Sequence, residues 1–187
     1  MGFKKYLNDY RLENVENKKG KIVTKAVYRG DYFVYRYRGE ELKRARLTVI
    51  SCSACLLVAF VMGLVFYRNS GFTSQYYTLA PYLLCLFPIF YLCLAVYNVI
   101  KTGEGVKTDR EHKDGIHDRI AKCTTGIMIL DGLCFAGLIV STVLKITGVE
   151  TRPFLYTDAV FIAASSLVLM LSAAVFVSKK KLVMEKM

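Results

Sequence analysis

One carboxylate lies in the middle of a long apolar run. Asp131 stands about halfway along the run Ile120–Leu144. An ionised carboxylate in such a setting costs several kcal/mol unless it takes up a proton or finds a partner. Such acids often mark a route for protons or cations, and Asp131 is therefore a candidate intramembrane polar site. The alternative is structural: a protonated Asp131 that hydrogen-bonds to a Tyr or Ser of a neighbouring helix.

The cysteines suggest a second kind of chemistry. All six lie within apolar runs, and Cys52 and Cys55 have the spacing of a redox or metal pair. In the orientation derived below, Cys52, Cys55, Cys93 and Cys123 lie at similar depth, so they form a candidate thiol cluster for zinc or an iron–sulfur centre. Membrane helices also accept cysteine freely as a small apolar residue. We expect no metal, no cofactor and no structural disulfide here.

Motifs for other catalytic chemistry are not found in the sequence. It contains no phosphate-binding glycine loop, no Ser-His-Asp order and no zincin motif. His112 and His117 lie among acidic and basic residues, at a spacing that fits no zinc site. The sequence therefore predicts a protein that is not an enzyme.

Four apolar runs define the architecture that must position these residues. They cover about 47–67, 76–100, 120–144 and 159–178, and each is long enough to cross a hydrocarbon core of about 30 Å as a helix. We expect an all-α membrane protein with a four-helix transmembrane bundle over 46–178. Glu40 and Glu41 followed by Lys43 and Arg44 favour a first helix that begins before the apolar run.

The distribution of basic residues predicts the orientation. The net charge is +11, and Lys and Arg gather before residue 47, over 101–122 and after residue 178. The opposite side has only Arg68, Lys145 and Arg152. Because Lys and Arg are retained in the cytoplasm, we expect a multi-pass protein of the cell membrane with both termini inside. The same charges predict attraction to anionic lipids of the inner leaflet and no nucleic-acid partner.

The segment 1–45 is expected to form structure at the cytoplasmic face. Phe3, Tyr6, Leu7 and Tyr10 follow the spacing of an amphipathic helix, which lies on the membrane surface or packs on the rest of this face. Strand-forming residues over Lys21–Arg38, interrupted by Gly30-Asp31, predict a β-hairpin with its turn there. Such a hairpin needs a supporting surface. The end of the chain, 179–187, is expected to be a basic cytoplasmic tail.

Small residues and prolines predict how the helices pack. Ser51, Cys55, Ala59 and Gly63 recur every four residues, and such a stripe lets another helix approach closely. Pro81 and Pro88 are expected to bend the second span. Asp158, at the start of the fourth span, is expected to be a helix N-terminal acid.

These features predict an accessory, assembly or regulatory membrane protein that binds a partner protein or anionic lipid at its cytoplasmic face, with a homo-oligomer as a further possibility. The first alternative is a small oligomeric transporter or channel that moves protons or cations by way of Asp131. A weaker alternative is a thiol- or metal-dependent redox protein built on the candidate thiol cluster.

Overall fold

The computed structural model describes the chain except residues 1–8, 17–21, 71, 73–74, 103–105, 149–154 and 187. It is mostly helical, and four helical lengths within the described residues are long and apolar enough to cross a membrane. This confirms the four runs expected from the sequence. The helices are α1 (Glu40–Tyr67), α2 (Tyr76–Leu84), α3 (Leu86–Lys101), α4 (Arg110–Ile146) and α5 (Tyr156–Ser178).

Helix α1 begins well before the apolar part of its sequence, as expected. Glu40 and Glu41 occupy its first turn, where the helix dipole favours acids. Gly39 precedes the helix with a φ of 64°, a conformation that glycine adopts without steric cost. The chain can therefore change direction sharply at this point before it enters the bundle.

The second apolar run is broken into α2 and α3 at Cys85. Pro88 has no N–H to donate to the carbonyl of Leu84, four residues earlier. The N–H of Cys85 donates to the carbonyl oxygens of Pro81 at 3.2 Å and Tyr82 at 3.1 Å, which tightens the last turn of α2. The bend expected from Pro81 and Pro88 thus occurs as a break in the helix at Cys85.

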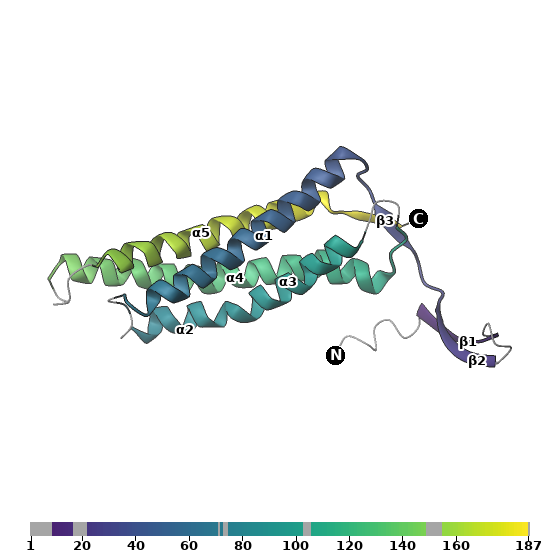
Figure 1. The fold of residues 1–187 in the computed structure, drawn as a ribbon, viewed down its shortest axis with the longest axis horizontal. Coiled ribbons are helices and arrows are strands. Elements are labelled where there is room, and N and C mark those ends of the chain that lie inside the picture. Colours follow the sequence, from purple (N-terminus) through teal and green to yellow (C-terminus); the bar gives the residue numbers. More distant parts are fainter. Residues whose placement is uncertain are drawn as a thin grey trace.

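The helices form an elongated bundle in which α4 touches α2, α3 and α5, and α1 packs mainly along α5 (Figure 1). Aromatic rings fill the core toward one end. The ring centroid of Phe161 lies 5.1 Å from that of Tyr67 and 5.0 Å from that of Tyr82, and Tyr82 stacks on Phe60 at 4.8 Å. These contacts hold α1, α2 and α5 together.

At the other end of the bundle, one basic side chain caps the C-terminus of helix α3. The guanidinium of Arg46 on α1 donates to the carbonyl oxygens of Val99 at 2.9 Å and Ile100 at 3.1 Å, in the last turn of α3. Carbonyl groups at a helix C-terminus lack partners within the helix, and a cation suits them. Arg46 therefore ties α1 to α3.

The N-terminal strands pair differently from the sequence prediction. Strand β1 (Tyr10–Glu16) pairs antiparallel with β2 (Ile22–Tyr28), and Asn14 opposes Thr24. The expected hairpin over Lys21–Arg38 with a turn at Gly30-Asp31 is therefore wrong. Alternating apolar residues precede β2 as well as follow it, so β2 had two possible partners in the sequence.

The expected amphipathic helix is also incorrect at its end. Tyr10 lies in β1, where it opposes Tyr28, and its ring packs edge-on against the Tyr28 ring at 5.3 Å. The other residues on which that helix depended, Phe3, Tyr6 and Leu7, lie outside the described residues.

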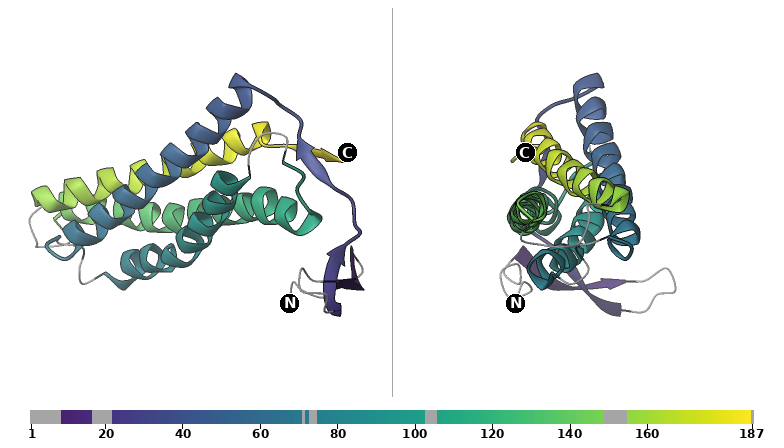
Figure 2. Two further views of the ribbon diagram at one scale, coloured as in Figure 1. Left: turned by 45° about the vertical axis from the view of Figure 1, so that its right-hand side comes forward. Right: turned by 90° about the vertical axis from the view of Figure 1, so that its left-hand side faces the viewer.

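A second small sheet joins the segment before α1 to the segment after α5. Strand β3 (Phe33–Tyr35) pairs antiparallel with β4 (Met184–Lys186), which follows a 3-10 turn at Lys179–Lys181. Ion pairs join Lys186 to Asp31 at 2.9 Å and Arg36 to Glu185 at 3.4 Å. The described part of the C-terminal segment is thus tied to the chain that leads into α1 (Figure 2).

Candidate functional site

Asp131 lies in the core of the bundle on α4, with none of its surface exposed. The hydroxyl of Ser165 on α5 donates to Asp131 Oδ1 at 2.9 Å. Asp131 Oδ2 is buried and has no hydrogen-bond partner among the described residues. The partner is thus a serine of a neighbouring helix, and one carboxyl oxygen is left without a donor.

Three side chains around Asp131 were not singled out from the sequence. Tyr82 on α2, Cys85 at the break before α3 and Cys134 on α4 are all buried, and they lie in the neighbourhood of Asp131. The Tyr82 hydroxyl does not serve the carboxyl group, because it donates to the carbonyl of Phe60 at 3.1 Å. The available signal for Cys85 was the pair Pro81 and Pro88, which were expected to bend the second span around it.

A buried ion pair joins α4 to α5 nearer one end of the bundle. Lys145 Nζ lies 2.8 Å from Asp158 Oδ2, and the side chains are 2% and 0% exposed. The same carboxylate oxygen accepts the backbone N–H of Leu155 at 3.0 Å, and the Lys145 ammonium lies 4.3 Å from the centroid of the Phe72 ring. Asp158 therefore caps α5, as expected, and also neutralises Lys145, which the sequence did not indicate.

Neutral polar groups accompany this ion pair. The Ser141 hydroxyl on α4 lies 2.5 Å from Gln75 Oε1, to which it donates, and 2.8 Å from the Tyr77 hydroxyl on α2. This network joins α2 to α4 inside the bundle. It satisfies polar groups that would otherwise be costly to bury.

The small-residue stripe is divided between the core and the surface. Ala59 and Gly63 are buried, whereas Ser51 and Cys55 are exposed. A Cβ atom added to Gly63 would overlap the Tyr82 hydroxyl and lie 3.4 Å from the Cβ atom of Ala164 on α5. Close packing therefore depends on the second half of the stripe.

The candidate thiol cluster has no shared site in the structure. Cys52 is half-buried, Cys55 and Cys93 are exposed, Cys123 is buried, and all are free thiols. Over the part of the chain that the structure describes, no three Cys, His, Asp or Glu side chains are grouped as metal ligands. The similar depth expected from the sequence does not bring these four side chains to a common point.

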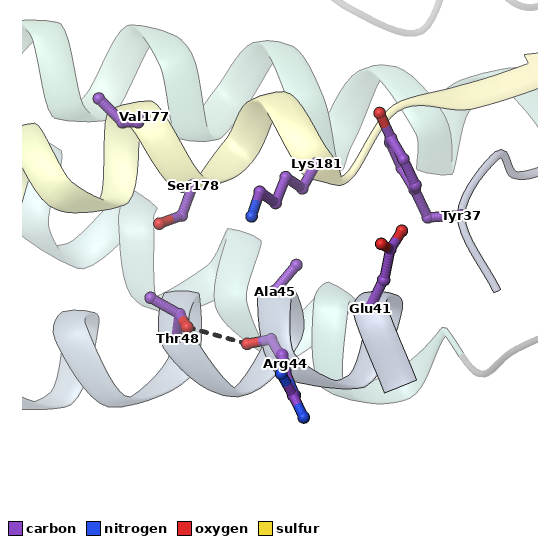
Figure 3. Close-up of a pocket in the computed structure, with 8 residues that line it drawn as sticks. All are labelled: Tyr37, Glu41, Arg44, Ala45, Thr48, Val177, Ser178 and Lys181. Atoms are coloured by element: carbon purple, nitrogen blue, oxygen red, sulfur yellow. Dashed lines mark hydrogen bonds between the residues drawn. The ribbon is translucent and has the colours of Figure 1, made fainter. Parts of the chain in front are cut away.

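A crevice of about 580 Å³ opens between the start of α1 and the end of α5 (Figure 3). Acidic, basic, hydroxyl and apolar side chains contribute to its wall. The lining residues are Tyr37, Glu41, Arg44, Ala45, Thr48, Val177, Ser178 and Lys181. Of these, Glu41 and Arg44 belong to the charged start of α1, and Lys181 belongs to the basic cluster after α5.

The β1–β2 hairpin extends beyond the same end of the bundle (Figures 1 and 2). The backbone N–H of Arg110 donates to the Tyr28 hydroxyl at 3.1 Å, and the Tyr10 hydroxyl donates to Asp109 Oδ2 at 3.5 Å. Burial and the nearby Asp109 carboxylate raise the pKa of Tyr10. Leu12 and Ile22, farther along the strands, are 77% and 75% exposed.

Comparison with protein-family models, with curated proteins and with solved structures found no match to this chain.

Proposed function

We propose that this chain is a multi-pass protein of the cell membrane with both termini in the cytoplasm. Its helices carry large apolar side chains on their outer surface as well as in the core, among them Val58, Phe87 and Met170. Water would not tolerate so much exposed apolar surface, whereas lipid does. Helix α5 has 23 residues, so it extends about 35 Å and matches a hydrocarbon core of about 30 Å.

The biochemical role that we propose is that of an accessory, assembly or regulatory protein, without catalytic activity, that binds a partner protein through its β1–β2 hairpin. The observation that carries this proposal is a pair of large apolar side chains, Leu12 and Ile22, that the hairpin exposes on one face. Leu12 lies two residues before Asn14, Ile22 lies two residues before Thr24, and Asn14 opposes Thr24. Side chains two residues apart share one face of a strand, so Leu12 and Ile22 lie on the same face.

Physical considerations favour a partner protein for this face. A two-stranded hairpin is marginally stable in water by itself. The contacts described above join this hairpin to the start of α4 only through Tyr10 and Tyr28. The opposite face carries the charged residues Arg11, Glu13 and Lys25 together with the half-buried Val27. A partner that covers Leu12 and Ile22 would stabilise the hairpin and leave the charged face in water. Anionic lipid at the membrane surface is the alternative ligand.

A photo-crosslinking amino acid at Ala26 tests this proposal. Ala26 is exposed and directly opposes Leu12. We expect one defined protein adduct in the native membrane, identified by mass spectrometry, and we expect Leu12→Asp to lower its yield roughly tenfold, because a buried Leu contributes about 1.5–3 kcal/mol. Lys25→Asp, on the other face, is the matched control and should leave the adduct unchanged. Adducts to lipid alone, or equal effects of both variants, would contradict the proposal.

The second candidate function is proton- or cation-coupled transport by way of Asp131, in an oligomer. The observation in its favour is the buried Asp131 Oδ2 atom, which has no hydrogen-bond partner among the described residues. The break between α2 and α3 is a second feature that could serve such a route. Complete burial of the carboxyl group favours the structural role instead. The two roles are separated by the Asp131 variants described in the Discussion.

A further inference from the structure

The crevice between α1 and α5 lies where both helices change from charged to apolar sequence. On α1, the charged stretch Glu40–Arg46 is followed by Leu47, and on α5 the apolar run ends at Ser178 before Lys179–Lys181. The lining residues come from both sides of these two boundaries. In a membrane-inserted protein, such a boundary coincides with the level of the lipid head groups.

Two opposite charges border this crevice without pairing. Figure 3 shows the Lys181 ammonium directed into the space between α1 and α5 and the Glu41 carboxylate directed toward Tyr37, while the Arg44 guanidinium points away. Among the ion pairs of the described residues, none includes the side chain of Glu41 or Lys181, and among the residues lining the crevice the only hydrogen bond drawn in Figure 3 joins Thr48 to Arg44. The crevice thus offers a ligand one ammonium group, that of Lys181, and one carboxylate, that of Glu41, at different places on its wall (Figure 3).

We infer that this crevice binds the head group of a zwitterionic phospholipid, one that carries a primary ammonium group beside its phosphate. Lys181 donates hydrogen bonds to the phosphate oxygens, and the Ser178 hydroxyl is a further donor beside them. Glu41 accepts from the ammonium group, with the ring of Tyr37 next to it. The acyl chains then lie along the apolar parts of α1 and α5, which continue from Ala45 and Val177 toward the middle of the membrane.

Glu41 is the residue that separates this ligand from a purely anionic one. A phosphate or a phosphatidylglycerol head group would satisfy Lys181 but would meet the Glu41 carboxylate as a like charge, which disfavours binding. A zwitterion satisfies both groups at once. The inference rests on the membrane insertion in the proposed function, because only insertion places lipid head groups at this level.

Lipid retention by the full-length protein tests the inference. The purified protein in mild detergent is titrated with phosphatidylethanolamine, with phosphatidylglycerol of the same acyl chains, and with soluble O-phosphoethanolamine, and bound molecules are counted by native mass spectrometry. We expect one phosphatidylethanolamine to be retained in preference to the other two probes. Equal binding of O-phosphoethanolamine would overturn the lipid assignment in favour of a free phosphorylated amine. Preference for phosphatidylglycerol would overturn the zwitterionic assignment.

Variants of the two charges provide the decisive comparison. Lys181→Gln and Glu41→Gln should each weaken phosphatidylethanolamine retention roughly tenfold, since each removes a charge-assisted hydrogen bond. Lys180→Gln, which removes the neighbouring charge outside the crevice lining, is the matched control and should bind as the wild type does. Loss of binding in Lys181→Gln alone would contradict the role of Glu41, and unchanged binding in both would overturn the site. Thermal unfolding of each variant in the same detergent shows whether weaker binding reflects loss of the fold.

Failure of this inference and failure of the proposed function are distinguishable. The crevice variants leave Leu12 and Ile22 unchanged, so the hairpin adduct at Ala26 should persist in them. Extraction of the chain from membranes by alkaline carbonate would instead contradict the insertion on which both proposals depend.

Discussion

At the scale of single residues, the bundle holds charge in two different ways. Asp158 has a cation and a backbone N–H as partners, so its charge is compensated although it is buried. Asp131 has only the Ser165 hydroxyl, and its second oxygen has no donor among the described residues. A neutral, protonated carboxyl group at Asp131 is physically the less costly state.

Substitution of Asp131 separates the structural role from the transport role. Asp131→Asn keeps the shape and an oxygen that accepts from Ser165, so the free energy of unfolding in detergent should change by less than about 1 kcal/mol. Asp131→Leu should cost about 1 kcal/mol, because it removes an interhelical hydrogen bond and leaves the Ser165 hydroxyl without its partner. Ser165→Ala should cost a similar amount and serves as the control for the same bond.

Ion flux provides the complementary measurement for Asp131. Vesicles with the wild type and with Asp131→Asn should be equally silent to proton and cation gradients if the carboxyl group is structural. A robust flux through the wild type that disappears in a normally folded Asp131→Asn would contradict this expectation and establish the transport candidate.

At the scale of helices, the stripe on α1 can be tested with two of its own members. Gly63→Leu should destabilise the bundle by about 1–3 kcal/mol, because the added atoms would displace Tyr82 and Ala164 from a packed core. Cys55→Leu, about two turns earlier on the same stripe and exposed, should change unfolding much less. If neither substitution changes unfolding in a detergent assay, the stripe has no packing role. If both destabilise equally, close packing is not confined to its second half.

The helices were predictable from the sequence because each depends on local information. Long uncharged runs indicated the four spans, and Pro81 and Pro88 indicated a bend in the second one, since a proline within a helix removes a backbone hydrogen bond. The helices extend beyond the runs at Glu40 and Arg110, because charged residues continue a helix readily once it has left an apolar layer.

The strands and the polar contacts were less predictable because they depend on residues far apart in sequence. From the sequence, strand β2 could pair equally well with the segment before it or with the segment after it. Strand β4 has only three residues, too few for a recognisable pattern, and its partner β3 lies about 150 residues earlier. The Lys145–Asp158 pair likewise requires the α4–α5 arrangement before the two charges can be assigned to each other.

At the scale of the whole molecule, charge is strongly segregated between the two ends of the bundle. The hairpin, the start of α1, the start of α4 and Lys179–Lys181 gather at one end (Figure 1). At the other end, Lys145 is buried and paired with Asp158, so it adds little to the charge that this end presents. The pairing of Lys145 therefore leaves this end with less free positive charge, which favours the orientation expected from the sequence.

Reporter fusions test this orientation directly. Alkaline phosphatase, which is active only outside the cytoplasm, should be inactive after Met187 and active when inserted within 149–154, between α4 and α5. A fluorescent protein that folds only in the cytoplasm should give the reverse pattern at the same two positions and serves as the control for expression. The physical reason is that moving the many Lys and Arg side chains of the segments before α1, between α3 and α4 and after α5 across the bilayer costs far more than moving the few at the opposite end. The reverse pattern with both reporters would place Glu41 and Lys181 outside the cell, and the hairpin could then meet no cytoplasmic partner.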